Sequence, residues 1–104
     1  MTLAMPAALA AGSALLLLAH GDAVWIQRDP KYLAADGVHC CGVNDCRPAH
    51  PGEVIEQGDA YLIAPSGQRF EDGAAGLHAS IDQRYWVCLW QNRVRCLFVP
   101  RLTN

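Results

Sequence analysis

Five cysteines, with a histidine beside the first of them, are the residues whose types and spacing could do chemistry. Cys40 and Cys41 are adjacent, Cys46 follows closely, and Cys88 and Cys96 lie near the C-terminal end. Cysteines can form disulfides, bind soft metal ions or exchange disulfides as thiolates. Because the chain also begins with an apolar leader, we interpret all five as candidates for the disulfide framework of an exported domain.

The pairing of these cysteines stays open at the level of sequence. A hairpin that places Cys88 opposite Cys96 would allow a local disulfide, and Cys46 would then pair with Cys40 or Cys41. The competing arrangement ties the N-terminal loop to the hairpin, and its longer closed loops give the larger entropic stabilisation. We favour the local pairing. Either arrangement leaves one cysteine over, which is buried or links two copies of the chain as a disulfide dimer.

The alternative chemistry is a metal or redox site made of His39, Cys40, Cys41 and Cys46. Imidazole and thiolate ligands suit zinc or copper, and His39 could lower the pKa of Cys40 for thiol–disulfide chemistry. Adjacent cysteines rarely serve one tetrahedral ion, however, an oxidising compartment consumes thiols, and the chain has no Cys-x-x-Cys motif. We therefore expect no cofactor and keep zinc, copper or redox chemistry as the alternative.

The N-terminal leader predicts export. Residues 1–21 contain no Asp, Glu, Lys or Arg, and small residues at Ala19, Gly21 and Ala23 suit cleavage near 21–23. Pro and Gly interrupt the apolar run, which falls short of the ~20 apolar residues of a spanning helix. Removal of residues 1–23 is therefore favoured over an uncleaved membrane anchor. We expect a single small domain over 24–104, periplasmic or secreted.

The charge of the chain restricts its partners. The net charge is −2 and 17% of residues are charged, so neither a nucleic acid nor a strongly acidic ligand is indicated. Arg84, Arg93, Arg95 and Arg101 nevertheless give the C-terminal part a basic bias beside aromatic residues. Such a surface could contact an anionic glycan or another envelope protein, although a solvated strand face is the plainer interpretation.

The remaining polar residues do not form a catalytic pattern. His20, His50 and His78 are scattered along the chain. A Ser-His-Asp triad from Ser80, His78 and Asp82 fails, because neighbours this close would need an unusual loop and no nucleophile elbow surrounds the serine. We interpret 80–83 as a turn and predict no catalytic residues. The expected function is a non-enzymatic structural or binding module.

The segment that carries the first three cysteines has few regular elements. Asp29 can cap a helical turn with Pro30 in its first position, and this turn would continue to Ala35 and end at 36–37. Residues 39–46 then predict a compact loop. Two prolines at positions 48 and 51 exclude a helix and a central strand there.

Strand signals follow. Residues 53–57 and 60–64 flank Gly58-Asp59, which predicts a two-residue hairpin, and 68–71 adds a third strand. The stretch 72–78 is predicted as a loop or a brief helix.

The clearest strands are 85–90 and 94–99, joined by a three-residue loop at 91–93. This register places six residues on one core-facing side, namely Trp86, Cys88, Trp90, Val94, Cys96 and Phe98. The other side carries Arg95 among apolar residues, so we expect another strand or the N-terminal segment to cover part of it. The fold class is mainly β, with small antiparallel hairpins and a meander, a short N-terminal helical turn and disulfide stabilisation.

Several short motifs together resemble a family of small exported bacterial proteins of uncharacterised function. The motifs are His39-Cys40-Cys41, Asp45-Cys46, Tyr61, Ser80-x-Asp82, Tyr85-Trp86-x-Cys88 and Arg95-Cys96-x-Phe98-x-Pro100. The resemblance spans 25–100. It implies export and a shared fold, and it implies no activity.

Overall fold

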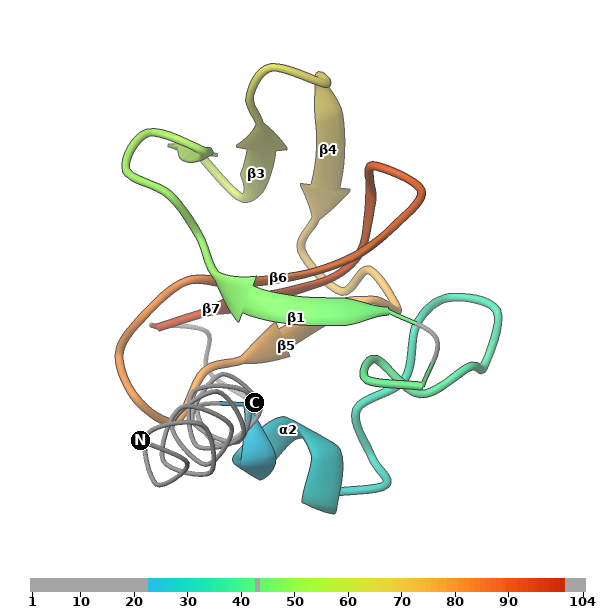
Figure 1. The fold of residues 1–104 in the computed structure, drawn as a ribbon. Coiled ribbons are helices and arrows are strands. Elements are labelled where there is room, and N and C mark those ends of the chain that lie inside the picture. Colours follow the sequence, from blue (N-terminus) through green and yellow to red (C-terminus); the bar gives the residue numbers. More distant parts are fainter. Residues whose placement is uncertain (1–22, 43, 101–104) are drawn as a thin grey trace, which may run out of the picture.

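A computed structural model describes residues 23–42 and 44–100 of the chain (Figure 1). The predicted leader lies outside the described residues except for its last residue, and so does Arg101. The structure confirms a mainly β, disulfide-stabilised fold with one short described helix. Its elements are α2 (Val24–Arg28), β1 (Asp45–Pro48), β2 (Val54–Gln57), β3 (Ala60–Ile63), β4 (Gln68–Glu71), β5 (Leu77–Ala79), β6 (Trp86–Trp90) and β7 (Arg93–Val99).

The strands form two sheets. One has the order β1-β6-β7-β5 and the other the order β2-β3-β4. Neighbouring strands are antiparallel except β5, which runs parallel to β7. In Figure 1, β3 and β4 lie above the β6–β7 hairpin and α2 lies below it. The hairpin is therefore the central layer, and it has one core on each side.

The predicted three-strand meander is confirmed. The turn between β2 and β3 is Gly58-Asp59, and Gly58 has φ +61°. A positive φ at the first turn residue is what a tight two-residue hairpin requires, and glycine adopts it without a Cβ clash. Pairing of β3 with β4 completes the second sheet.

Two side chains link the first sheet to the second sheet and to the residue just before it. Arg47 in β1 donates from both terminal nitrogens to the Glu53 carboxylate, each at 2.8 Å, and this pairing lowers the pKa of Glu53. Gln68 in β4 donates to the Val94 carbonyl and accepts from the Val94 N–H, both at 2.9 Å. The relative position of the sheets is thus held by polar contacts as well as by packing.

The β6–β7 hairpin agrees with the predicted register at one end and departs from it at the other. Trp86 lies opposite Phe98 and Cys88 opposite Cys96, as expected. The loop has two residues, both with positive φ, and the predicted three-residue loop is wrong. A β-bulge at Arg95 absorbs the difference, because it places one extra residue in β7.

The bulge changes which side chains reach the core. Trp90 lies opposite Arg93 and is 45% exposed, so its predicted place in the core is wrong. Val94 is buried, but in the opposite core from the one predicted. The first core, on the α2 side, contains Ile26, Tyr32, Cys40, Trp86, Cys88, Cys96 and Phe98, with Trp25 packed against it. The second, below the β2-β3-β4 sheet, contains Ile63, Leu77, Val87, Val94, Leu97 and Val99.

The N-terminal segment also differs from its prediction. Residues 29–35 form turns and a single bridge, and the described helix ends before them at Arg28. The Asp29 carboxylate accepts the Lys31 N–H at 3.0 Å, so Asp29 does cap a turn, but no helix follows it. Among the described residues, no helix has both the length and the apolar character needed to span a membrane.

The structure has two short edge strands that the sequence does not predict, β1 and β5. β1 falls within and just after the predicted loop, and it ends at Pro48 at the edge of the sheet, where a missing N–H costs no ladder bond. β5 follows Gly76, where a Cβ would lie only 2.6 Å from the Arg95 carbonyl oxygen. Glycine at this position lets the chain approach the bulge of β7 closely enough to pair beside it.

Candidate functional site

Two disulfides join the N-terminal segment to the central hairpin. Cys40 is bonded to Cys96 and Cys46 to Cys88, with Cα separations of 5.8 and 3.9 Å, and Cys41 is the free cysteine. The favoured local pairing of Cys88 with Cys96 is therefore wrong, and the competing arrangement is the observed one. The prediction of one leftover thiol is confirmed.

The register of three strands places Cys88 between two possible partners. Cys88 in β6 lies opposite Cys96 in β7 and also opposite Cys46 in β1. Cys88 can bond to only one of these neighbours. Cys46 forms that bond across the β1–β6 pair, and Cys96 is bonded to Cys40, whose N–H donates to the Tyr32 carbonyl at 2.9 Å.

The free thiol of Cys41 lies directly beside a disulfide. Its Sγ is 3.0 Å from the Sγ of Cys46, and the side chain is partly buried. Burial raises the pKa of the Cys41 thiol to about 11, because a thiolate there would lose water without gaining a cation. At neutral pH Cys41 is consequently a thiol.

His39 positions the backbone of this loop. Its Nε2 donates to the Asp29 carbonyl at 2.9 Å, and its Nδ1 accepts the Cys41 N–H at 3.0 Å. This assignment follows from the partners, because a carbonyl can only accept and an N–H can only donate. The predicted effect of His39 on a Cys40 thiolate is wrong for this form of the protein, since Cys40 is in a disulfide.

The disulfides also restrict the alternative of a metal site. Of the four ligands it needs, Cys40 and Cys46 are bonded to other sulfurs, and both ring nitrogens of His39 are engaged. Two groups of metal-ligating side chains are close together among the described residues, and each contains both sulfurs of one disulfide. Metal binding at either group would require reduction of that disulfide first.

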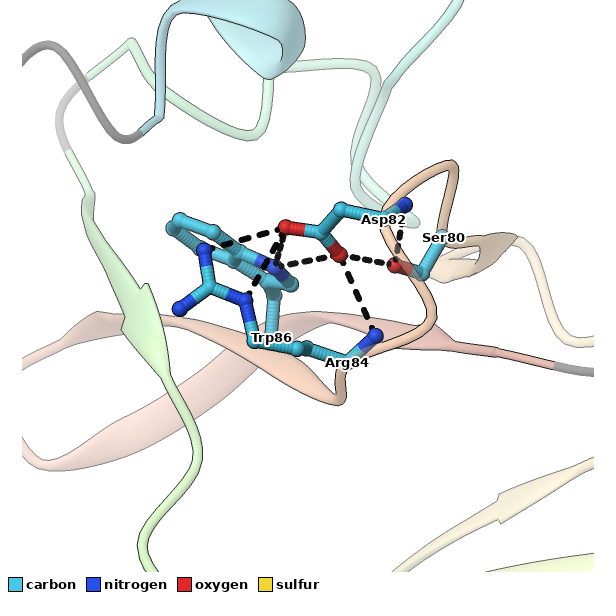
Figure 2. A network of polar contacts seen from close by, with 4 residues as sticks. All are labelled: Ser80, Asp82, Arg84 and Trp86. Atoms are coloured by element: carbon cyan, nitrogen blue, oxygen red, sulfur yellow. Dashed lines mark hydrogen bonds and ion pairs between the residues drawn. The ribbon is translucent and has the colours of Figure 1, made fainter.

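A polar network occupies the turn before β6, and Figure 2 shows its four side chains. The Asp82 carboxylate accepts from Ser80 Oγ at 2.7 Å, from Trp86 Nε1 at 3.0 Å, and from Arg84 through Nε and the backbone N–H. Burial raises the pKa of Asp82, but these hydrogen bonds outweigh it and leave the pKa below its usual value. The network fixes the buried indole of Trp86 in the first core.

No catalytic triad forms at this turn. The Ser80 hydroxyl donates to Asp82, whereas His78 Nε2 is bonded to the Leu33 carbonyl at 2.8 Å and its ring packs against Tyr32 and Phe98. Burial is the main cause that lowers the pKa of His78. The Ser80 and Asp82 oxygens accept the backbone N–H groups of Asp82 and Arg84, as expected for the turn predicted at 80–83.

A surface hollow of about 450 Å³ beside β5 does not gather reactive groups either. Lys31, Tyr32, His78 and Ile81 are among its lining residues. Lys31 is paired with Asp29, and the His78 ring nitrogen already has its carbonyl partner. The lining offers contact area without a free acid–base pair.

The described arginines do not form one basic surface. Arg84 precedes Trp86 at one end of the hairpin, pairs with Asp82 and lies over the indole ring, 4.9 Å from its centroid. Arg93 and Arg95 lie at the opposite end, and Arg95 is paired with Asp36.

Sequence reasoning missed two amide side chains, one beside the cysteines and one between the sheets. Asn44 is buried and its Nδ2 donates to the Cys40 carbonyl at 2.9 Å. Gln68 binds the backbone of Val94 across the sheets. Both are ordinary amides in loop or strand positions, and no sequence signal distinguishes them.

No family model, curated protein or solved structure matches the chain.

Proposed function

We propose that this chain is an exported, non-enzymatic structural or binding module, periplasmic or secreted, that depends on its disulfides for stability. The observation that carries the proposal is the pair of disulfides between the N-terminal segment and the β6–β7 hairpin. Such bridges persist in oxidising compartments and are rare in the cytosol. A domain this small also has a limited core, which makes cross-links valuable.

The polar side chains support a non-enzymatic role. Apart from the Cys41 thiol, the groups that could act as acid, base or nucleophile include Asp82, His39, His78 and Ser80, and each of these four is hydrogen bonded to a group that holds a turn or a loop. A general base must be within reach of a substrate proton. The hydrogen bonds of these four groups stabilise turns and loops of the fold.

The tip of the β6–β7 hairpin is the surface that best suits a partner. Trp90 is exposed, Arg93 beside it is exposed and has no ion pair with residues 23–42 or 44–100, and the Arg95 guanidinium lies 5.8 Å from the centroid of the Trp90 ring. Because Arg95 is paired with Asp36, Arg93 supplies the guanidinium for a ligand. An aromatic face beside an exposed guanidinium fits an anionic glycan, because the ring can stack and arginine can bind a carboxylate or sulfate. An acidic envelope protein is the other partner that fits.

Export and bridging can be tested together on protein purified from the envelope fraction. Intact mass before and after alkylation and reduction should show loss of the leader, two disulfides and one alkylated thiol. A retained leader with five free thiols in a folded protein would refute the proposal. Bound zinc or copper with several free thiols would favour the metal alternative. A doubled mass that reduction removes would show the dimer predicted through the leftover cysteine, which is Cys41 in the structure.

The binding surface can be tested on a column of sulfated polysaccharide. Trp90→Ala and Arg93→Ser should both reduce retention of the protein at low salt. The matched control is Arg69→Ser, since Arg69 is exposed but paired with Glu71 in β4. Equal losses in Arg93→Ser and Arg69→Ser would show that only total charge matters, and would refute this surface.

A further inference from the structure

Three sulfurs from separate parts of the chain lie together beside the first core. Cys41 comes from the loop before β1, Cys46 from β1 and Cys88 from β6. Their Sγ atoms all lie within 4.8 Å of one another. The Cys41 thiol is 3.0 Å from the Cys46 sulfur, which is already bonded to Cys88. Reacting atoms about 3–3.5 Å apart are at the separation of a near-attack arrangement.

We propose that Cys41, Cys46 and Cys88 form an intramolecular thiol–disulfide exchange site. The Cys41 thiol releases its proton to solvent, and its thiolate attacks the Cys46 sulfur. The Cys41–Cys46 bond forms as the Cys46–Cys88 bond breaks, and Cys88 leaves as a thiolate that takes up a proton. One disulfide and one thiol are present before and after, so the step needs no external oxidant or reductant.

The loop that carries the nucleophile is held from both sides. His39 accepts the Cys41 N–H, and Asn44 donates to the carbonyl of Cys40, the residue before it. Cys40 is itself fixed to β7 by its bond to Cys96. This anchoring keeps the Cys41 sulfur against Cys46 and remains in place during the exchange, since Cys40–Cys96 takes no part in it.

The exchange changes both the connectivity and the position of the free thiol. In one isomer β1 is linked to β6 and the thiol is on the partly buried Cys41. In the other, Cys41 and Cys46 close a short loop and the thiol is on Cys88, which is fully buried in β6. The N-terminal segment is then joined to the hairpin through Cys40–Cys96 alone. The two isomers coexist, and this inference does not depend on the proposed function.

Burial of Cys41 sets the speed of the step. Because the thiolate is the nucleophile and its pKa is about 11, the exchange is slow at neutral pH. At pH values below that pKa, the rate should rise about tenfold for each unit by which the pH is raised, because the thiolate fraction rises tenfold.

The test uses the full chain, folded, at neutral pH and in an alkaline series. Samples are quenched in mildly acidic guanidinium, the free thiol is labelled with a maleimide, and the labelled and cross-linked peptides are mapped by mass spectrometry. The label should pass from Cys41 to Cys88, with a matching rise of the Cys41–Cys46 cross-link. In the Cys41→Ser control, Cys88 should remain unlabelled at every pH. A label confined to Cys41 throughout, or Cys88 labelled equally in the control, would overturn the proposal.

A second variant tests whether the fold accepts the new bond. Cys88→Ser removes the leaving sulfur, so the oxidised protein should contain a Cys41–Cys46 disulfide beside an intact Cys40–Cys96. Two free thiols at Cys41 and Cys46 in folded, oxidised protein would contradict the inference. If this variant does not fold, the alkaline series with the wild-type chain and Cys41→Ser still decides the question.

Discussion

Replacing Cys40 and Cys96 by alanine removes the outer of two nested disulfides. The outer bridge spans 56 residues and the inner one, Cys46–Cys88, spans 42. With the inner bridge intact, the outer one closes only the short segments on either side of it, together about 14 residues, and its loss should cost about 3 kcal/mol of unfolding free energy. Removal of the inner bridge alone should cost a similar amount, also about 3 kcal/mol.

Removal of both disulfides should cost more than the two single losses together. Once one bridge is gone, the other closes a long loop and is worth about 4 kcal/mol, so the total loss is about 7 kcal/mol. The whole stability of a domain of this size is about 4–12 kcal/mol. We therefore expect each variant with one bridge to fold and the variant with none to be largely unfolded.

The assay is urea unfolding followed by tryptophan fluorescence, because Trp25 and Trp86 pack together in the first core. All variants carry Cys41→Ser, which prevents exchange and leaves the same background in each. A loss below about 1 kcal/mol for either pair would refute the entropic reasoning. If Cys40→Ala/Cys96→Ala were as unfolded as the variant without bridges, the cysteines would be paired locally and the nested arrangement would be wrong.

Three further predictions concern single side chains. Asp82→Asn should lower the unfolding free energy by about 2 kcal/mol, because charged hydrogen bonds to the Trp86 indole and its neighbours are lost. Near-ultraviolet circular dichroism and urea unfolding measure this effect. An unchanged spectrum and an unchanged urea midpoint would contradict the prediction. Since burial lowers the pKa of His78, the unfolded chain takes up this proton first, so stability should fall as pH drops below about 6.5. His78→Gln should flatten the urea midpoint over this range, and an equal slope in both proteins would refute the assignment. Gln68→Ala leaves the Val94 N–H and carbonyl without their partner, and a loss of about 1–2 kcal/mol is expected, with the exposed Gln83→Ala as the control.

The sequence predicts the second sheet well because its three strands are consecutive in the chain and are joined by short turns. Gly58-Asp59 is a tight hairpin turn by composition, and the strands on either side pair with each other at once. The β6–β7 hairpin was predictable only from its alternating pattern. That pattern could not distinguish a three-residue loop from a two-residue loop with a bulge, because both keep Trp86 and Cys88 on one face.

The disulfide partners required information that is not local. Cys88 has a neighbour in β7 and another in β1, and the second of these exists only because β1 pairs with β6. The sequence does not predict β1, because a short segment that ends in a proline has the composition of a loop. Contact between Cys41 and the Cys46 sulfur follows from the same strand, so this part of the site was beyond sequence reasoning.

The polar network at Asp82 was predicted in part. Ser80 and Asp82 were assigned to a turn from their side-chain oxygens, and their mutual hydrogen bond confirms that assignment. The bond to Trp86 depends on the angle at which the turn enters β6, which no pairwise spacing specifies. The predicted basic surface shows the limit of such reasoning. Arg84 and Arg93 are close in sequence, but they lie at opposite ends of the β6–β7 hairpin.

The most direct test of this account is a disulfide map of the oxidised protein, alkylated and digested under acidic conditions that prevent exchange. Fragmentation between Cys40 and Cys41 assigns their partners separately. We expect Cys40–Cys96 and Cys46–Cys88 cross-links and an alkylated Cys41 as the main species. A cross-link between Cys88 and Cys96 as the main species would contradict it.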